Sequence, residues 1–336
     1  MSRRVAVVGA GSWGTALAGV LARNGHSVRL WSFEERVTES IRRTGENRKY
    51  LEGVTLPPTL HATSDLAEAC EAADIVLSVS PSQFVGRVME NAGRHIPEGA
   101  LIVSASKGIE TSTLRRMDQV LADVLGDGAM RRFGVVSGPS FAAEVARESP
   151  TAVVAASSSA EVAREIQAAF QNGYFRVYTN ADVLGVELGG ALKNVIALAA
   201  GVTAGLGFGH NTMAAVITRG LAEITRLGLA MGAERPTFMG LAGMGDLVLT
   251  CTGELSRNRT VGYRLGRGES LEEILGGMHD VAEGVKTSQA VHDLARKHGV
   301  EMPITEQVHA MLAEGRSPRE ALQLLMSRDP KPEDWS

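Results

Sequence analysis

The feature that most constrains this chain is a glycine pattern close to its amino terminus. The stretch VAVVGAGSWGTALAG places Gly9, Gly11 and Gly14 in a GxGxxG spacing, directly after the apolar run Arg4–Val8. A helical pattern and then a second β-branched run, Ser27–Trp31, follow. In such a βαβ unit the first glycine permits a tight turn, the second lets a pyrophosphate approach the backbone, and the third lets helix and strand pack closely. The unit therefore predicts a dinucleotide at the helix N-terminus, with a ligand-free β–α turn as the alternative.

The same alternation of short apolar runs and helical patterns continues through the first half of the chain. The candidate strands are Arg4–Val8, Ser27–Trp31, Ile75–Val79, Leu101–Ser104, Phe133–Val136, Ala152–Ala156 and Phe175–Tyr178. The candidate helices are Thr15–Arg23, Leu66–Ala72, Ser82–Ala92, Ser112–Leu125 and Glu161–Phe170. Nearly all-apolar strands alternating with helices imply a parallel sheet covered on both faces. We expect a doubly wound α/β (Rossmann) domain over residues 1–181.

From residue 182 onward the strand signals disappear and helical patterns take over. The expected helices are 183–203, 212–230, 271–277, 286–298, 302–314 and 317–326, forming an all-helical domain over 182–328 with a flexible tail at 329–336. The first helix is nearly long enough to span a bilayer. It carries Glu187, Lys193 and Asn194 near its middle, and each is costly in hydrocarbon. We therefore expect the buried central helix of a soluble domain.

Composition narrows the function classes. The net charge of −4 gives no general attraction to nucleic acid or acidic membranes. Cys70 and Cys251 are far apart and outside any metal-binding spacing, so neither a disulfide nor a metal site is expected. Glycines and Trp13 interrupt the first apolar run before a secretory signal could form, which favours a cytoplasmic protein.

The residues after the second strand bear on the choice of dinucleotide. NAD sites usually offer an acidic residue to the ribose hydroxyls, and NADP sites often offer an arginine to the extra phosphate. Here the strand runs into SFEER, so Glu34 and Glu35 could bind ribose and Arg36 could bind phosphate. The pattern leaves both cofactors open.

Three further stretches indicate a substrate pocket. Lys107 and Gly108 follow one strand, and SGPS, residues 137–140, follows the next, at the sheet edge where doubly wound folds bind ligands. A surface lysine and an ordinary turn are the alternatives. Lys193 lies in the most apolar helix, where burial would lower its pKa toward the range of a proton donor and acceptor. Gly189 would leave room beside it, and the alternative is a lysine that reaches solvent or pairs with Glu187.

The stretch GLAGMGDLVLTCTGELSRNRTVG, residues 240–262, is either a long surface loop or the wall of an anion site. Asp246 follows a glycine turn, and the segment SRNR supplies the hydroxyl of Ser256, the guanidinium groups of Arg257 and Arg259, and the amide of Asn258. These groups side by side suit a phosphate, which arginine binds in a bidentate manner. A second expected loop, VAEGVKT, carries Val281, Glu283 and Lys286 and is uninformative alone.

Taken in order, these pieces resemble one family. GAGSWGTALA, SKG, SGPSFAAEV, LKN, AGMGDLVLTCTGELSRNR and VAEGV together resemble bacterial-type NAD(P)-dependent sn-glycerol-3-phosphate dehydrogenase over nearly the whole chain. The resemblance implies reversible reduction of dihydroxyacetone phosphate to sn-glycerol 3-phosphate for phospholipid synthesis, with NADPH slightly favoured, and a homodimer.

The resemblance also assigns residue roles. It implies that Lys193 is the proton donor and acceptor, with Lys107 orienting the substrate. The implied substrate contacts are Lys107, Gly138, Ser140, Lys193, Asp246, Ser256, Arg257 and Asn258. The implied cofactor contacts are Gly9, Gly11, Ser12, Trp13, Gly14, Phe33, Lys107, Ala142, Arg257, Val281 and Glu283.

One position departs from the family pattern. The family commonly offers a basic or polar side chain where this chain has Phe33, and a phenyl ring cannot pair with a 2′-phosphate. Two other functions stay open: a dehydrogenase of the same plan acting on a hydroxy acid, and a dinucleotide-sensing protein with an idle site.

Overall fold

The computed structural model describes residues 2–278 and 282–333, and the chain divides into two compact units. The first, here called the sheet unit, comprises the chain up to Lys107 together with Arg115–Glu187. The second, the helical unit, comprises Gly108–Leu114 and the chain from Leu188 onward. A seven-residue piece of the N-terminal half of the sequence thus belongs to the helical unit.

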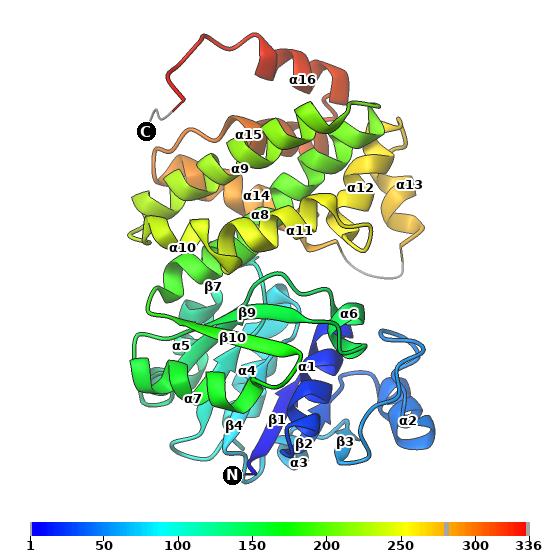
Figure 1. The fold of residues 1–336 in the computed structure, drawn as a ribbon, viewed down its shortest axis with the longest axis vertical. Helices are drawn as coiled ribbons and strands as arrows, with labels where there is room; N and C mark the ends of the chain where they lie inside the picture. Colours follow the sequence, from blue (N-terminus) through cyan, green and yellow to red (C-terminus); the bar gives the residue numbers. More distant parts are fainter. Residues whose placement is uncertain (1, 279–281, 334–336) are drawn as a thin grey trace. The chain divides into compact units, whose positions relative to one another are not determined.

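The sheet unit is built on eight strands in the order β10-β9-β8-β5-β4-β1-β2-β3 (Figure 1). The strands are β1 (Arg4–Val8), β2 (Ser27–Trp31), β3 (Leu60–Thr63), β4 (Ile75–Ser78), β5 (Leu101–Ser104), β8 (Phe133–Ser137), β9 (Thr151–Ala156) and β10 (Phe175–Asn180). Neighbours pair in parallel except β8 and β9, which are antiparallel. The six-strand part from β3 to β8 has the order of doubly wound nucleotide-binding sheets. The expected fold class is confirmed. The expectation of a wholly parallel sheet is wrong for one pair of strands, β8 and β9.

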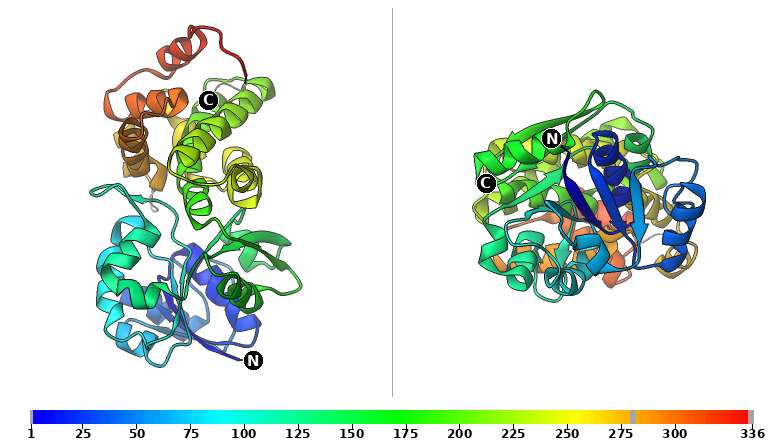
Figure 2. Two further views of the ribbon diagram at one scale, coloured as in Figure 1. Left: turned by 90° about the vertical axis from the view of Figure 1, so that its left-hand side faces the viewer. Right: turned by 90° about the horizontal axis from the view of Figure 1, so that it is seen from below.

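Helices cover both faces of this sheet. They are α1 (Ser12–Arg23), α2 (Glu35–Thr44), α3 (Leu66–Cys70), α4 (Val85–Gly93), α5 (Met117–Met130), α6 (Ala142–Ala146) and α7 (Ala160–Phe170), with a short 3-10 helix at Ser82–Phe84 before α4. Helices α1 and α7 lie on one face, and α4 and α5 lie on the other (Figure 2). Leu17 and Leu21 of α1 are fully buried, as are Val7 and Leu77 of the strands. Successive side chains of a strand point to opposite faces of the sheet, and because helices cover both faces, strand side chains are buried on either side.

Several elements differ from the sequence-based expectation. Neither α2 nor β3, a four-residue strand at the sheet edge, was predicted from the sequence. Helix α5 begins at Met117, not at residue 112, because two-residue strands, β6 (Ile109–Glu110) and β7 (Arg115–Arg116), come first. Between them Leu114 has a φ of 59°, a left-handed conformation that interrupts a helix.

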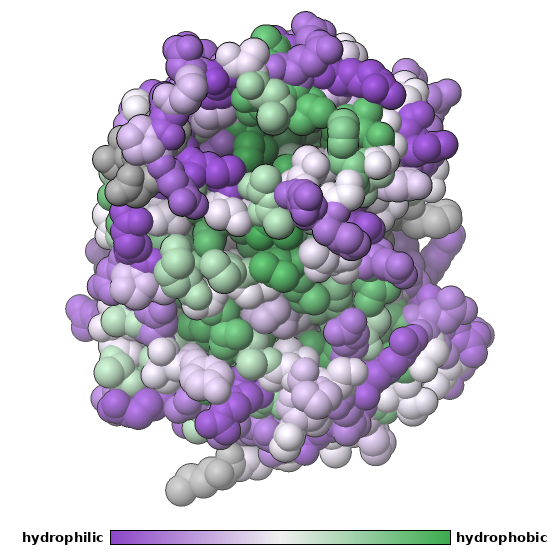
Figure 3. All heavy atoms as spheres, turned by 45° about the horizontal axis from the view of Figure 1, so that its top comes forward, coloured by the Kyte–Doolittle hydropathy of each residue, from purple (hydrophilic) through white to green (hydrophobic). Residues whose placement is uncertain are grey.

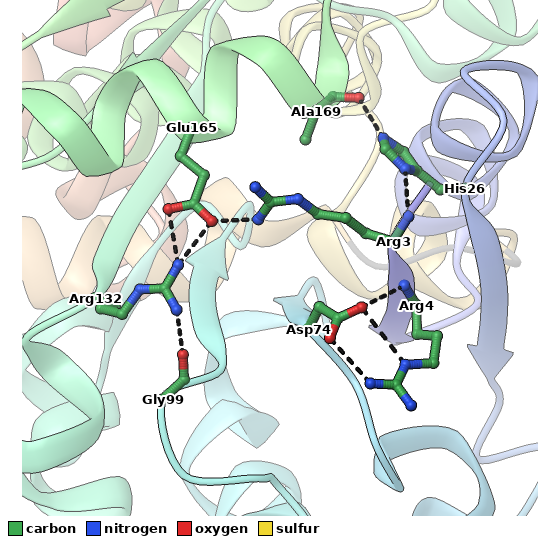
Figure 4. Close-up of polar contacts among 8 residues, drawn as sticks. All are labelled: Arg3, Arg4, His26, Asp74, Gly99, Arg132, Glu165 and Ala169. Atoms are coloured by element: carbon green, nitrogen blue, oxygen red, sulfur yellow. Dashed lines mark hydrogen bonds and ion pairs between the residues drawn. The ribbon is translucent and has the colours of Figure 1, made fainter. Parts of the chain in front are cut away.

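Ion pairs join several elements at the end of the sheet where strand β1 begins (Figure 4). Arg132 donates to both carboxylate oxygens of Glu165, at 2.7 and 2.8 Å, and Arg3 donates to the same carboxylate. Burial alone would raise the pKa of Glu165, but the two guanidinium groups outweigh it and hold the pKa below its usual value. This cluster ties α7 to the chain segments that enter β1 and β8.

Apart from β6, the regular structure of the helical unit consists of helices within the described residues. They are the unit's part of α8 (Val183–Gly205), then α9 (His210–Ala230), α10 (Arg235–Met239), a π-helical turn (Leu241–Gly245), α11 (Asp246–Thr252), α12 (Arg257–Gly266), α13 (Leu271–Gly276), α14 (Glu283–Lys297), α15 (Pro303–Ala313) and α16 (Pro318–Met326). Residues 240–262 are therefore mostly helical. The prediction of a glycine turn before Asp246 is wrong, and so is the alternative of a long surface loop.

Helix α8 is the apolar helix singled out from the sequence. By length and composition it could cross a membrane, but 83% of its most apolar window is buried inside the protein, as expected for a core helix. Its glycines allow close packing against α12. A Cβ at Gly201 would lie 2.1 Å from the carbonyl oxygen of Arg259, and one at Gly262 would lie 2.0 Å from that of Leu198. The two backbones therefore touch where any side chain would separate them.

Candidate active site

The glycine loop of the sheet unit has the shape that a dinucleotide pyrophosphate requires. Gly9 has a φ of 133°, and a Cβ there would lie 2.9 Å from backbone atoms of Val79 and Ser80. A Cβ at Gly14 would lie 1.9 Å from the Gly9 carbonyl oxygen. At Gly11, by contrast, an added Cβ would meet no heavy atom of the described residues within 4 Å. The outer glycines are thus required by packing, and the middle one leaves the backbone open to a ligand.

The start of α1 supplies the charge for that ligand. Gly11 is the N-cap residue and offers no side chain to the first helical amides, so these amides and the helix dipole face an incoming anion. Ser12 and Trp13 are the first two helical residues, and both are half-buried. The indole Nε1 of Trp13 is buried and has no hydrogen-bond partner among the described residues. These features fit a nucleotide phosphate at this helix.

The residues after β2 show an arrangement that the sequence did not reveal. Phe33 is 86% exposed and stands edge-on to the ring of Trp31 at 6.5 Å. The carboxylate of Glu34 accepts hydrogen bonds from Lys49, at 2.5 Å, and from the hydroxyl of Tyr50. The hydrogen bond from Lys49, followed by that from Tyr50, lowers the pKa of Glu34. The acidic side chain expected to face ribose is therefore already engaged.

The loops after β5 and β8 meet at one carbonyl group. The ammonium of Lys107 donates to the carbonyl oxygen of Gly138 at 3.0 Å, and the hydroxyl of Ser140 donates to the same oxygen at 2.9 Å. Gly138 has a φ of 140°, and a Cβ there would lie 3.0 Å from the Cα of Val153. The structure brings together these three predicted residues, and Ala142 follows as the first residue of α6.

The helical unit contains a buried ion pair at Lys193. Its Nζ lies 2.5 Å from the Asp246 carboxylate and 2.8 Å from the hydroxyl of Thr250, and the side chains of Lys193 and Asp246 are 9% and 1% exposed. The partner is thus Asp246, 53 positions along the chain, not Glu187. Gly189, one turn earlier on α8, lets the π-helical turn approach, since a Cβ there would lie 2.4 Å from the Ala242 carbonyl oxygen.

The SRNR segment begins α12 and contacts the start of α14. Ser256 is the N-cap of α12, and its hydroxyl accepts a hydrogen bond from the amide of Arg259. The side-chain oxygen of Asn258 accepts the amide of Gly284 at 3.0 Å, one residue after Glu283. Arg257 is exposed. Val281 lies outside the described residues, so its expected role has no structural account.

Two other classes of site have no support in the described parts of the chain. No group of three or more His, Cys, Asp or Glu side chains there could hold a metal. Cys70 and Cys251 are free and buried, and burial raises their thiol pKa values to about 11 and about 12. Both thiols are therefore protonated near neutral pH and unreactive.

The sheet order, the glycine loop and a helical unit with a buried lysine together define a dinucleotide-dependent oxidoreductase of two-unit plan. Comparison with known families is consistent with this class. Residues 4–163 match the model for the N-terminus of NAD-dependent glycerol-3-phosphate dehydrogenase, and residues 182–323 match that for its C-terminus.

Individual relatives match over the full length. The chain is 57% identical to glycerol-3-phosphate dehydrogenase (NAD(P)+) of Citrifermentans bemidjiense, covering 99% of both chains, and 57% identical to that of Geobacter sulfurreducens, covering 100% of both. The crystal structure of the Coxiella burnetii glycerol-3-phosphate dehydrogenase matches with a TM-score of 0.92 at 42% identity, over 97% of this chain and 99% of that one. The chain belongs to the NAD-dependent glycerol-3-phosphate dehydrogenase family.

Proposed function

We propose that this protein reduces dihydroxyacetone phosphate reversibly to sn-glycerol 3-phosphate, with NAD(P)H as cofactor, and supplies glycerophospholipid synthesis. The observation that carries the proposal is the buried Lys193 ammonium held by Asp246 and Thr250 in a chain of this family. When bound, the reduced nicotinamide supplies the hydride. The glycine loop and the first turn of α1 would hold the dinucleotide phosphates.

Lys193 is the proposed proton donor. In the reductive direction its Nζ gives a proton to the oxygen of the substrate carbonyl as that oxygen becomes an alkoxide, and in the reverse direction the neutral amine takes the proton back. Asp246 and Thr250 orient the amine through the bonds of 2.5 and 2.8 Å. General acid catalysis of this kind contributes about 10²–10⁴ in rate.

The remaining predicted residues would bind the substrate. Ser256, Arg257 and Asn258 would hold the phosphate group, Arg257 through its guanidinium. Since the Asn258 oxygen accepts the amide of Gly284, its NH₂ group is the part that suits phosphate oxygens. Lys107, Gly138 and Ser140, already linked at one carbonyl, would orient the substrate in the sheet unit.

We propose NADPH as the preferred cofactor. Engagement of Glu34 by Lys49 and Tyr50 offsets the negative charge that would otherwise repel a 2′-phosphate. Lys49 and the exposed Arg36 add positive charge close to Glu34. These two side chains could bind the 2′-phosphate in place of the basic residue that the family commonly has at the position of Phe33. A hydrogen bond to a charged group contributes about 1.5–3 kcal/mol, or roughly 10- to 100-fold in discrimination. Lys49→Ala should therefore lower the ratio of kcat/KM for NADPH to that for NADH at least about tenfold.

We also propose that the protein works as a cytoplasmic homodimer. Figure 3 shows apolar side chains gathered in patches on one face of the molecule. Exposed apolar residues of the helical unit include Met239, Met244, Val248 and Leu255. Light scattering after size-exclusion chromatography tests the oligomeric state, and a monomer at micromolar concentration would refute the homodimer.

The deciding experiment follows loss of nicotinamide absorbance with dihydroxyacetone phosphate, using NADPH and NADH in parallel and unphosphorylated dihydroxyacetone as control. Turnover that requires the phosphate supports the reaction, and Lys193→Ala should then lose about 10²–10⁴ of kcat while dinucleotide binding persists. Lys297→Ala, an exposed lysine of the same unit, is the matched control. Dinucleotide binding without turnover would refute the reaction and favour a hydroxy-acid dehydrogenase or a sensor.

A further inference from the structure

Asn47, in the loop between α2 and β3, is a buried polar side chain that the proposed reaction does not use. It is fully buried, with a relative exposure of 0%. Its side-chain NH₂ group donates to the carbonyl oxygen of Ala10 at 2.9 Å and to the hydroxyl of Thr15 at 2.8 Å. Ala10 is the second residue of the GxGxxG loop, 37 positions earlier in the chain.

The loop that carries Asn47 holds it firmly. The backbone carbonyl of Asn47 accepts the amide of Leu51 at 2.8 Å, and its side-chain oxygen accepts the amide of Tyr50 at 3.2 Å. The loop closes on itself where the amide of Leu56 donates to the carbonyl of Gly45 at 2.8 Å. Leu51 and Leu56 are buried in the core of the sheet unit. Asn47 is therefore a fixed donor.

The bond to Ala10 fixes a particular peptide plane. The Ala10 carbonyl and the Gly11 N–H belong to one planar trans peptide, so they point in opposite directions. Because Asn47 draws the carbonyl oxygen into the protein interior, the Gly11 N–H is directed outward. Gly11 is the residue at which an added Cβ would meet no described heavy atom within 4 Å. The amide is thus directed toward the open side of the loop.

We infer that Asn47 is a positioning residue for dinucleotide binding, which holds the Gly11 amide where it donates to the cofactor pyrophosphate. The inference rests on the proposed use of the glycine loop for NAD(P)H. Thr15, the first residue whose amide bonds back to Gly11 (2.9 Å), completes the arrangement, because its hydroxyl receives the second Asn47 bond. Preorganisation of this kind favours binding because the amide need not reorient when the ligand arrives.

The test compares binding of the whole dinucleotide with binding of a fragment that has no 5′-phosphate. Asn47→Ala should raise the Kd of NADPH about tenfold or more, measured by fluorescence or calorimetry, while the Kd of adenosine 2′-monophosphate changes less than about twofold. In kinetics, the KM for NADPH should rise while kcat at saturating NADPH stays within about threefold. Equal loss for both ligands would indicate general loosening of the unit and would overturn the inference.

A matched control comes from the same unit. Asn24 also donates through its side chain to a backbone carbonyl, that of Ala169 at 2.8 Å, at the opposite end of α1 from the glycine loop. Asn24→Ala should lower the melting temperature without changing the Kd of NADPH. Asn47→Asp, which keeps the shape and the acceptor oxygen but lacks the NH₂ group, serves as the second variant and should also weaken NADPH binding.

A measurement on the wild-type protein needs no variant. With ¹⁵N-glycine labelling, the Gly11 amide proton should move downfield when NADPH is added, as a charge-assisted hydrogen bond requires. An unchanged Gly11 resonance despite saturation with NADPH would overturn the inference. Failure of NADPH and NADH to bind the wild-type protein at all would instead refute the proposed function, so the two failures are distinguishable.

Discussion

Substitution of Asp246 by Asn should strongly destabilise the helical unit. Lys193 and Asp246 are almost completely buried, and their charged groups lie 2.5 Å apart. Removal of one partner leaves an uncompensated charge in a low-dielectric environment, which costs about 3–5 kcal/mol. At about 1.4 kcal/mol per factor of ten, the unfolding equilibrium constant should rise roughly 10²- to 10³-fold or somewhat more.

Chemical denaturation followed by circular dichroism measures this cost. The control is Asp74→Asn, which breaks an exposed pair with Arg4 whose side chains are 61% and 41% exposed and should cost less than about 1 kcal/mol. The double variant Lys193→Met/Asp246→Leu replaces both charges by apolar groups and should recover most of the loss while remaining inactive. A loss below about 1 kcal/mol for Asp246→Asn would refute the reasoning, because the pair would then behave as a surface pair.

Three further predictions concern stability. Burial raises the pKa of Glu223 to about 7, so between pH 4.5 and 7 the folded state holds a proton that the unfolded state releases. The free energy of unfolding should therefore fall by at most about 3 kcal/mol as the pH rises over this range. Glu223→Gln should flatten this pH dependence, measured by urea titrations at several pH values. The lowered pKa of Glu165 has the opposite sign, because the folded state favours the ionised carboxylate. Glu165→Gln should therefore cost about 1 kcal/mol at pH 7, and the difference in melting temperature from the wild type should vanish as the pH falls through the lowered pKa of Glu165. Gly201→Ala should destabilise by about 1–3 kcal/mol, because its Cβ would lie 2.1 Å from the Arg259 carbonyl oxygen, whereas Gly128→Ala, whose Cβ would meet no described atom within 4 Å, should not destabilise in the same denaturation assay.

The sequence predicted the sheet well where strands are buried on both faces. The bounds of β1, β2 and β5 agree with the prediction to the residue, because most of the residues in these strands are apolar or β-branched and buried. Strand β3 was not predicted because it is short, lies at the sheet edge and includes the exposed His61. Helices α11 and α12 were not predicted because the glycines before α11 and those within α12 read as loop signals. In α12 Gly262 instead serves close packing against α8.

The residues of the candidate site could be picked out from the sequence by residue type, but their hydrogen-bond partners could not. The glycine loop and Lys193 stand out because their local sequence is unusual for a loop or a core helix. The partner of Lys193 does not stand out in the sequence, because Asp246 is 53 positions away and only tertiary packing brings the two residues together. Asn47 and Lys49 lie in a segment with no marked spacing, so nothing in the sequence links them to Ala10 or to Glu34.

The piece Gly108–Leu114 has a consequence for any attempt to divide the molecule. It belongs to the helical unit although more than seventy residues of the sheet unit, Arg115–Glu187, follow it in the chain, and its Ile109 is completely buried. A gene cut once at the border near Leu188 would therefore give a C-terminal fragment with a hole in its core, and an N-terminal fragment with an unburied apolar loop. Separate production of the halves needs a transplant of this loop, or a circular permutation that keeps it with α14, the helix against which β6 packs.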